Sequence, residues 1–301
     1  MANIPVTFRA RAESAPSLRL RFPRIEAIDK LHFEIVRGCQ LQCVGCPNST
    51  LQPQVKRIAV EDFNFLLGRI DVERVAYLRL FSFGEPLLHR DLAGILECIP
   101  RQRWTTGRVE ISTNAQFANW NDLEAALRTR ILSHIAVSCD GDGTPEEYER
   151  LRPPSRWSKL IEFLERVYEL RQRYCPAMEL MTRTICTDPE AQARWRSILE
   201  PRGWTPEFRG WLYLPESQQN MTGHDISAPR RVCSFQAVHN RLYVDWDGTV
   251  VPCCAHPRAG VFGNLRDNTY NEIMHARTRA RFLRTMELER GSMSICNACE
   301  F

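Results

Sequence analysis

Lysine and long apolar runs are what the sequence most clearly lacks. Lys30, Lys56 and Lys159 are the only lysines among 40 basic residues, and 36 acidic residues leave a net charge of only +4. The basic residues are scattered and form no stripe that could follow a phosphate backbone, so we expect no nucleic-acid partner. A run of about 18 apolar residues is also missing, so we expect no membrane-spanning segment.

The N-terminal region lacks the apolar core of a signal peptide as well. Met1–Arg24 alternates arginines with short apolar stretches, which predicts a cytoplasmic protein. The chain nevertheless has 12 cysteines. Because the cytosol keeps thiols reduced, clustered cysteines there usually bind metals or take part in catalysis, and a disulfide scaffold is not expected.

Apolar runs of strand length alternate with segments of helix length through most of the chain. The expected strands are Leu31–Val36, Val75–Phe81, Arg108–Ser112, Ile135–Ser138, Met178–Cys186 and Glu207–Leu214. The expected helices are Val60–Ile70, Asp91–Ile99, Asn121–Leu132 and Trp157–Arg173. Successive βα units of this kind form a mostly parallel sheet with functional loops at the carboxyl ends of its strands. We therefore predict an α/β fold, a partial (β/α)6 TIM-like barrel.

The texture of the sequence changes after Leu214, where polar residues, proline and glycine replace the apolar runs. Farther on, Arg241–Trp246 and Thr249–Val251 flank an Asp-Gly pair, which is a strong hairpin signal, and a helix is expected at Tyr270–Leu288. We predict a small C-terminal annex made of a β-hairpin and a helix. The expected divisions are an N-terminal extension (1–30), the barrel (31–214), a connecting loop (215–232) and the annex (233–301).

The first cysteine cluster, Cys39, Cys43 and Cys46, directly follows an expected strand with the spacing Cys-x-x-x-Cys-x-x-Cys. Three thiolates on one loop can bind three irons of a 4Fe–4S cluster and leave the fourth iron without a protein ligand. An iron with open positions can chelate S-adenosylmethionine (AdoMet) and reduce its sulfonium. A zinc site or three buried thiols is the alternative, but zinc usually requires a fourth ligand, for which His32 is the nearest candidate.

This loop resembles that of the radical AdoMet superfamily, and the resemblance extends over about Leu31–Arg209. Phe83-Gly84-Glu85-Pro86 resembles the family's Gly-Gly-Glu-Pro segment, which binds the amino group of the methionine moiety. Ser112-Thr113-Asn114 resembles the segment beside the ribose, and Ser138 begins a sequence similar to the family's Ser-x-Asp-Gly. Arg183 stands where a carboxylate-binding residue is often found. The cofactor-binding residues that the resemblance implies are Glu85, Ser112, Asn114, Ser138 and Arg183.

Two positions depart from the family pattern. Gly45 precedes the third cysteine, where the family usually places an aromatic or bulky residue over the adenine, so the adenine must pack against another residue. Phe83 replaces the first glycine of the Gly-Gly-Glu-Pro segment. Neither position is an expected iron ligand.

Five further cysteines lie within residues 233–301, which is too dense for chance and implies a second metal site. Their spacing, with a hairpin and a terminal Cys-x-x-Cys, resembles the half-length SPASM annex, also called a twitch domain, which binds one auxiliary 4Fe–4S cluster. The ligands that this resemblance implies are Cys233, Cys253, Cys296 and Cys299. A structural zinc site with the same four thiolates is the alternative.

Cys254 is the cysteine that this ligand set leaves over. Successive residues of a strand point to opposite faces, so Cys254 should face away from a metal that Cys253 binds, and it could reach a cavity between annex and barrel. A thiol in that cavity could donate a hydrogen atom to a substrate carbon radical and invert the stereocentre. The alternative is a buried, inert cysteine.

Two reactions suit these features. Hydrogen abstraction followed by return from a thiol is epimerisation, and abstraction followed by loss of a proton and an electron is dehydrogenation of an alcohol. Cys254 favours epimerisation. The size, the single auxiliary cluster and the lone hairpin cysteine resemble the neomycin C epimerase and its dehydrogenase relatives in aminoglycoside biosynthesis, which implies an aminosugar or aminocyclitol substrate and an external electron donor such as flavodoxin or ferredoxin.

A polycationic aminoglycoside would require carboxylates in the site. The candidates are Asp140, Glu207, Glu216 and Asp225, although each taken alone also suits a solvated surface. A ribosomally made peptide is an alternative substrate, for which we expect a leader-binding domain that the sequence before residue 31 does not suggest, although Phe8–Arg24 is basic. An iron–sulfur electron carrier or scaffold is the non-enzymatic alternative.

Overall fold

Six adjacent parallel strands form the centre of the protein, as the sequence predicts. The computed structural model describes residues 23–227, 233, 235–236, 241–254, 256 and 258–301, so most of the expected N-terminal extension lies outside the described residues. The strands follow one another in chain order across the sheet. They are β1 (Ala27–Phe33), β4 (Arg74–Arg79), β5 (Thr105–Thr113), β6 (His134–Asp140), β7 (Glu179–Ile185) and β8 (Thr205–Arg209). This arrangement confirms the partial (β/α)6 barrel.

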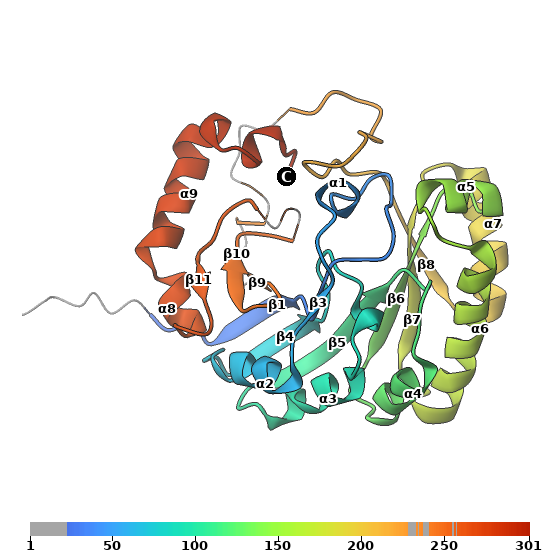
Figure 1. Cartoon of the computed structure of the whole chain (residues 1–301), viewed down its shortest axis with the longest axis horizontal. Helices are drawn as coiled ribbons and strands as arrows, with labels where there is room; N and C mark the ends of the chain where they lie inside the picture. Colours follow the sequence, from blue (N-terminus) through green and yellow to red (C-terminus); the bar gives the residue numbers. More distant parts are fainter. Residues whose placement is uncertain (1–22, 228–232, 234, 237–240, 255, 257) are drawn as a thin grey trace, which may run out of the picture.

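Helices cover the outer side of the curved sheet (Figure 1). They are α2 (Val60–Gly68), α3 (Leu92–Glu97), α4 (Trp120–Arg128), α5 (Pro145–Leu151), α6 (Trp157–Tyr174) and α7 (Pro189–Leu199). Two of them, α5 and α7, are not among the helices expected from the sequence. Thr144 and Asp188 cap these two helices, and a proline occupies the first position of each, so their start signals were readable.

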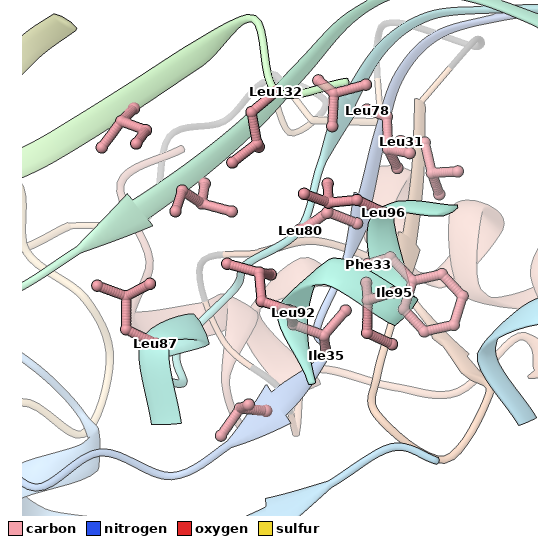
Figure 2. Close-up of a cluster of buried hydrophobic side chains, with 14 of the residues drawn as sticks. Leu31, Phe33, Ile35, Leu78, Leu80, Leu87, Leu92, Ile95, Leu96 and Leu132 are labelled. Atoms are coloured by element: carbon pink, nitrogen blue, oxygen red, sulfur yellow. The ribbon is translucent and has the colours of Figure 1, made fainter. Parts of the chain in front are cut away.

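The alternation of side chains along each strand separates a dry outer core from a polar interior. Leu31, Phe33, Leu78 and Leu80 are buried and lie against the leucine and isoleucine side chains of α3 (Figure 2). His32 and Arg79, which alternate with these residues, instead line an internal cavity. Since neighbouring side chains of a strand point to opposite faces, the inner face of the barrel is free to carry functional groups.

The annex continues the barrel sheet. Strand β9 (Arg241–Val244) pairs in parallel with β1, with Leu242 opposite Leu31, and β10 (Thr249–Val251) pairs antiparallel with β9. Strand β11 (Gly263–Asn264) completes a sheet of nine strands. The hairpin follows the sequence expectation, and Gly248 adopts a φ of +89° at its turn, which suits glycine. The pairing with β1 brings the residues after β10 to the barrel interior.

The helix expected at Tyr270–Leu288 is two helices, α8 (Tyr270–Met274) and α9 (Arg277–Glu289). Asn271 ties α8 to the barrel, since its backbone N–H donates to the Asp71 carboxylate (2.9 Å) and its side chain donates to the Ile25 carbonyl (3.2 Å). Phe282 and Met286 on α9 instead pack in the annex. The chain therefore changes direction between α8, which docks on the barrel, and α9, which packs in the annex. No helix in the described part of the chain is long and apolar enough to cross a membrane.

Candidate active site

The loop that carries Cys39, Cys43 and Cys46 lies between β2 (Val36–Arg37) and the short helix α1 (Asn48–Leu51). Backbone N–H groups of the loop donate to carbonyls at the end of α5, from Gln42 to Pro153 (2.6 Å) and from Val44 to Leu151 (3.0 Å). All three cysteines line one cavity of about 390 Å³. The spacing seen in the sequence thus places three thiols on one wall.

Burial makes these thiols weak acids in the absence of a metal. It raises the pKa of Cys39 to about 11 and that of Cys46 to about 12. The Asn114 side-chain amide donates to the Cys39 sulfur (3.3 Å), as does the Leu41 backbone N–H (3.4 Å). Such donors stabilise a thiolate, and a metal that binds here must displace the thiol protons. The donor set therefore fits a thiophilic metal centre.

The segment that resembles Gly-Gly-Glu-Pro is held against the cysteine loop. The buried Glu34 carboxylate accepts hydrogen bonds from the backbone N–H groups of Phe83 and Gly84, both at 3.0 Å. A Cβ at Gly84 would stand 1.6 Å from the Val36 carbonyl oxygen, so only glycine fits. The backbone N–H of Glu85 then donates to the Gly38 carbonyl (3.0 Å).

The Glu85 side chain is buried in the cavity wall, where its carboxylate accepts from the backbone N–H groups of Asn114 (2.7 Å) and Leu87 (3.0 Å). Burial nevertheless raises its pKa to about 7. Because a buried carboxylate is costly when it has no cationic partner, this group is suited to receive a ligand cation.

All the cofactor-binding residues implied by the resemblance line the same cavity. These are Glu85, Ser112, Asn114, Ser138 and Arg183. Arg183 also forms an ion pair with Glu110 of β5. The structure therefore brings together on one concave surface residues that come from four different strand ends or loops.

A tryptophan that the sequence analysis did not single out stands where the missing aromatic of position 45 would lie. A Cβ at Gly45 would be 2.7 Å from the Cζ3 atom of Trp211, which follows β8 and lines the cavity. The Ser217 hydroxyl also donates to the Gly45 carbonyl (3.1 Å). Glycine at position 45 thus makes room for an aromatic ring from the other end of the barrel.

Four arginines also line the barrel cavity, and the sequence analysis had singled out only one of them. Arg183 was a candidate, whereas Arg79, Arg152 and Arg209 carry no local sequence signal. Arg152 is buried and forms an ion pair with Asp140 beside the cysteine loop. The Arg152 charge also lowers the pKa of Cys43, which burial raises.

The carboxylates expected for a polycationic substrate do not form an acidic wall. Asp140 lines the cavity, but Arg152 neutralises it. Glu207, Glu216 and Asp225 are absent from the lining of this cavity among the described residues. Glu207 pairs with Arg183 of the neighbouring strand and with Arg209 of its own strand. Glu216 pairs with His256 and Arg258, and Asp225 is exposed.

The annex holds a second, separate cavity of about 20 Å³. Its lining includes all four expected ligands, Cys233, Cys253, Cys296 and Cys299. The buried Arg290 guanidinium, which the sequence analysis missed, donates to the carbonyls of Cys296 (3.0 Å) and Cys299 (2.7 Å). This positive charge shapes the terminal Cys-x-x-Cys turn and would offset part of the negative charge of four thiolates.

Cys253 and Cys254 line different cavities, as expected, but they follow the end of β10 and are not strand residues as the sequence analysis assumed. Cys253 lines the annex cavity and Cys254 lines the barrel cavity. Within the described residues, no group of three His, Cys, Asp or Glu side chains is arranged to hold a single metal ion. The structure gathers the cysteines at two places, with Cys39, Cys43 and Cys46 lining the barrel cavity and the four annex cysteines lining the other cavity.

Comparisons with known proteins agree with this division. Residues 233–300 match the SPASM family, an iron-sulfur cluster-binding domain. This match confirms the resemblance of the annex. The whole chain is similar to a solved structure of hexahistidine-tagged anSMEcpe with bound AdoMet, at 15% sequence identity and a TM-score of 0.63, covering 92% of this chain and 85% of that chain.

A second solved structure, native anSMEcpe with bound AdoMet and Cp18Cys peptide, matches at 15% identity and a TM-score of 0.59, covering 91% of this chain and 88% of that chain. No curated protein sequence matches the chain. At this identity the structural likeness establishes a shared fold, and it confirms the partial barrel with its C-terminal annex.

Proposed function

We propose that the protein is a radical AdoMet enzyme that epimerises a carbon centre of its substrate and uses Cys254 as the hydrogen donor. The observation that carries the proposal is the position of Cys254, which lines the same cavity as the three loop cysteines and Glu85. Cys39, Cys43 and Cys46 would hold an iron–sulfur cluster, and this cluster with AdoMet would supply the radical chemistry that removes a hydrogen atom from the substrate.

The residues of the chain would bind the cofactor through complementary charge and shape. The buried Glu85 carboxylate suits the ammonium group of the methionine moiety. Trp211 offers an aromatic face to the adenine at the place that Gly45 leaves open, because bases stack well on aromatic rings. Ser112 and Asn114 offer hydrogen bonds to the ribose, and Arg152 lies near enough to the cysteine loop to bind a carboxylate.

The role of Cys254 requires that its sulfur keep its proton. Burial raises the pKa of Cys254 to about 11, although the nearby Arg79 charge opposes this shift. The S–H bond is therefore intact at neutral pH. It breaks homolytically when the hydrogen atom moves to the substrate carbon radical, and the C–H bond forms on the face opposite to abstraction. One electron from an external donor of the flavodoxin or ferredoxin type and one proton from water then restore the thiol.

Two other outcomes are distinguished by what happens to the substrate radical. If the radical loses a proton and an electron, the product is a ketone and the enzyme is a dehydrogenase of an aminocyclitol or aminosugar alcohol. A peptide substrate is the other alternative, because one of the similar structures contains a peptide beside AdoMet. The aminoglycoside is an expectation from the layout of the sequence alone, and the arginines that line the cavity favour a different substrate class.

The decisive experiment follows hydrogen at Cys254. Protein reconstituted anaerobically with iron and sulfide is incubated with AdoMet, dithionite and a pseudotrisaccharide aminoglycoside or a peptide in deuterated buffer. The wild type is expected to form 5′-deoxyadenosine and an inverted product that carries deuterium at the inverted carbon. Cys254→Ala is expected to form 5′-deoxyadenosine with no inverted product.

Cys186→Ala is the matched control, because Cys186 is also a buried thiol but lines neither cavity. It should behave as the wild type. Unchanged inversion by Cys254→Ala would exclude the thiol as the donor. An oxidised product without deuterium would establish dehydrogenation, and the absence of 5′-deoxyadenosine under all conditions would favour an electron carrier.

A further inference from the structure

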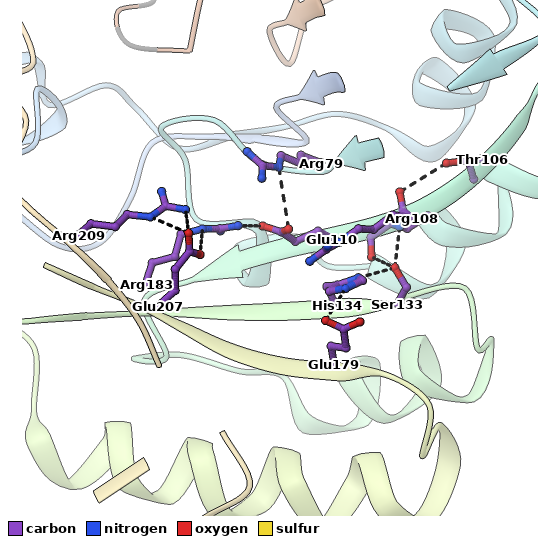
Figure 3. A network of polar contacts seen from close by, with 11 residues as sticks. Arg79, Thr106, Arg108, Glu110, Ser133, His134, Glu179, Arg183, Glu207 and Arg209 are labelled. Atoms are coloured by element: carbon purple, nitrogen blue, oxygen red, sulfur yellow. Dashed lines mark hydrogen bonds and ion pairs between the residues drawn. The ribbon is translucent and has the colours of Figure 1, made fainter. Parts of the chain in front are cut away.

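Three arginines gather on the inner face of the barrel, each from a different strand. Arg79 of β4, Arg183 of β7 and Arg209 of β8 all line the barrel cavity. Figure 3 shows their guanidinium groups directed toward Glu110 and Glu207, which join them into one network. We call these three residues the arginine cluster.

Acidic residues only partly balance this cluster. Glu110 pairs with Arg183 and lies 3.9 Å from Arg79, whereas Glu207 bonds Arg209 at 2.6 Å and lies 4.0 Å from Arg183. Two carboxylates therefore face three guanidinium groups. Burial raises the pKa of Glu110, and its pairing with Arg183 opposes this shift.

Unused hydrogen-bond donors point to the missing partner. The Nε atom of Arg79 and the Nη1 atom of Arg183 are buried and have no hydrogen-bond partner. Burial, followed by the charge of Arg183, lowers the pKa of Arg79 to about 10. Buried polar donors and like charges are unfavourable unless a bound group satisfies them, and the fork of a guanidinium matches an oxyanion best.

Building on the proposed function, we infer that the substrate carries an anionic oxygen group, a carboxylate or a phosphate, which binds the arginine cluster beside Cys254. The cavity volume of about 390 Å³ is near the lower end of the usual range for ligand sites. Since the cavity must also hold AdoMet, only a small substrate or one part of a larger substrate can enter. An anchored oxyanion would hold the reacting carbon against the thiol.

The carboxylate of AdoMet is the competing occupant, and the positions of the charges favour the substrate. Arg152 directly follows Leu151, whose carbonyl accepts from the Val44 backbone N–H of the cysteine loop (3.0 Å). His32, the sheet partner of Arg79, instead packs against Tyr243 of β9, with the ring centres 5.0 Å apart. Burial and then the Arg79 charge lower the pKa of His32. Arg152 therefore lies at the cofactor end, and Arg79 lies toward the annex, which supplies Cys254. Arg183, which the sequence resemblance assigns to a carboxylate, is paired with Glu110.

The test compares two alkylating reagents that differ in charge. Anaerobically reconstituted holoprotein is treated at alkaline pH with iodoacetate or iodoacetamide, and the modification of Cys254 is measured by peptide mass spectrometry. The rate ratio of iodoacetate to iodoacetamide is normalised to free cysteine. An oxyanion site next to the thiol predicts a ratio raised at least tenfold in the wild type, competed away by inorganic phosphate, and lost in Arg79→Met and Arg209→Met.

Arg108→Met is the matched control. Arg79 and Arg108 both stack on the ring of Tyr77, at 4.4 and 4.6 Å from its centre, but Arg108 does not line the cavity. The control should keep the wild-type ratio, and Arg79→Lys should keep part of it. If purified Arg79→Met contains no iron, this variant is left out. Arg79→Lys and Arg209→Met are then compared with the wild type instead.

Saturating AdoMet distinguishes the two occupants. If the arginine cluster binds the substrate, the preference for iodoacetate persists with AdoMet present. A preference that AdoMet abolishes, or a ratio that no arginine substitution changes, would overturn the inference. Since alkylation requires no radical chemistry, this result is independent of whether 5′-deoxyadenosine forms, which tests the proposed function.

Discussion

The two cysteine-lined cavities each contain four thiols but differ in volume and polarity. The barrel cavity measures about 390 Å³ and combines three loop cysteines with acidic and basic side chains. The annex cavity measures about 20 Å³ and encloses four cysteines behind apolar residues such as Phe282 and Met286. Metal sites that perform chemistry keep a position open to an external ligand, whereas structural sites are closed by protein ligands. We therefore expect reactions in the barrel and a supporting role for the annex.

The two cavities are also linked through adjacent residues. Cys253 and Cys254 lie just after the end of β10 and line different cavities, and β10 is fixed by the pairing of β9 with β1. The annex thus delivers a thiol to the barrel while it closes its own site. A substitution in one cavity should consequently leave the other site intact.

Loss of one ligand in the open site should have the largest effect. Cys46→Ala removes one of the three loop thiols, so the barrel cluster should not form, and AdoMet cleavage should fall to background. Iron should decrease from about eight to about four per chain, with sulfide in parallel. Iron analysis and chromatography of 5′-deoxyadenosine after dithionite reduction measure both quantities, with Cys186→Ala as the control. Zinc at these thiols in the wild type would contradict the assignment.

Loss of a ligand in the closed site should separate the two functions. Cys299→Ala should also reduce iron to about four per chain, but substrate-free AdoMet cleavage should continue because the loop cysteines are untouched. The variant should unfold at a lower temperature, since metal binding contributes to folding free energy. Thermal unfolding, iron content and 5′-deoxyadenosine formation are compared with those of Cys46→Ala. Equal loss of cleavage in both variants would show that the sites are not separable.

The sequence predicts what depends on local spacing. The cysteine loops, the Glu85 segment and the Asp-Gly hairpin each lie within a few residues, and the strand order follows from simple βα succession. These features required no knowledge of distant contacts. The separation of Cys253 from Cys254 was predicted from alternation along a strand, but β10 ends at Val251, so the two thiols separate for a different structural reason.

The remaining features depend on contacts between distant segments. Pairing of β9 with β1 joins residues about 210 positions apart, and no local pattern encodes it. Arg79 and Arg209 are two among many scattered arginines, and only their strand positions bring them together. No local sequence pattern assigns Trp211 to the site. Its assignment follows from the short distance between its ring and Gly45. The sequence analysis expected carboxylates in the barrel cavity because it started from a polycationic aminoglycoside substrate.

A buried group of the barrel cavity should also make the free energy of unfolding depend on pH, which we do not expect of the annex cavity. Glu85 has an ordinary pKa of 4.5 that burial raises to about 7. Between these values the folded protein binds more protons than the unfolded chain, so the free energy of unfolding falls as pH rises, by roughly 3 kcal/mol in total from this group.

Glu85→Gln should remove this contribution, so the difference in stability between wild type and variant should change across pH 4.5 to 7 and be constant below that window. Urea unfolding of the metal-free protein at several pH values measures it, because bound iron would add its own proton release. Glu34→Gln offers a comparison, since burial raises the pKa of Glu34 to about 8 and its transition should extend to higher pH. A pH-independent difference for Glu85→Gln would mean that the carboxyl titrates normally.

The smallest effect should come from the aromatic residue that faces Gly45. Trp211→Ala removes a ring from the cofactor end of the cavity, and stacking of a base on an aromatic side chain contributes about 1–3 kcal/mol. The Kd for AdoMet should therefore rise roughly 5- to 100-fold, while Trp211→Phe should restore most of the affinity. Equilibrium binding to the reconstituted protein measures both variants.

Leu212→Ala is the matched control, because Leu212 is the next residue and its side chain is exposed. Iron content should be unchanged in all three variants, since Trp211 is no ligand. Restoring an aromatic at position 45 instead, as in Gly45→Tyr, should weaken binding in the wild-type background because the new ring would collide with Trp211. The same substitution combined with Trp211→Ala should recover affinity. Failure of the double variant to recover would indicate that glycine at position 45 serves the loop backbone and not the aromatic contact.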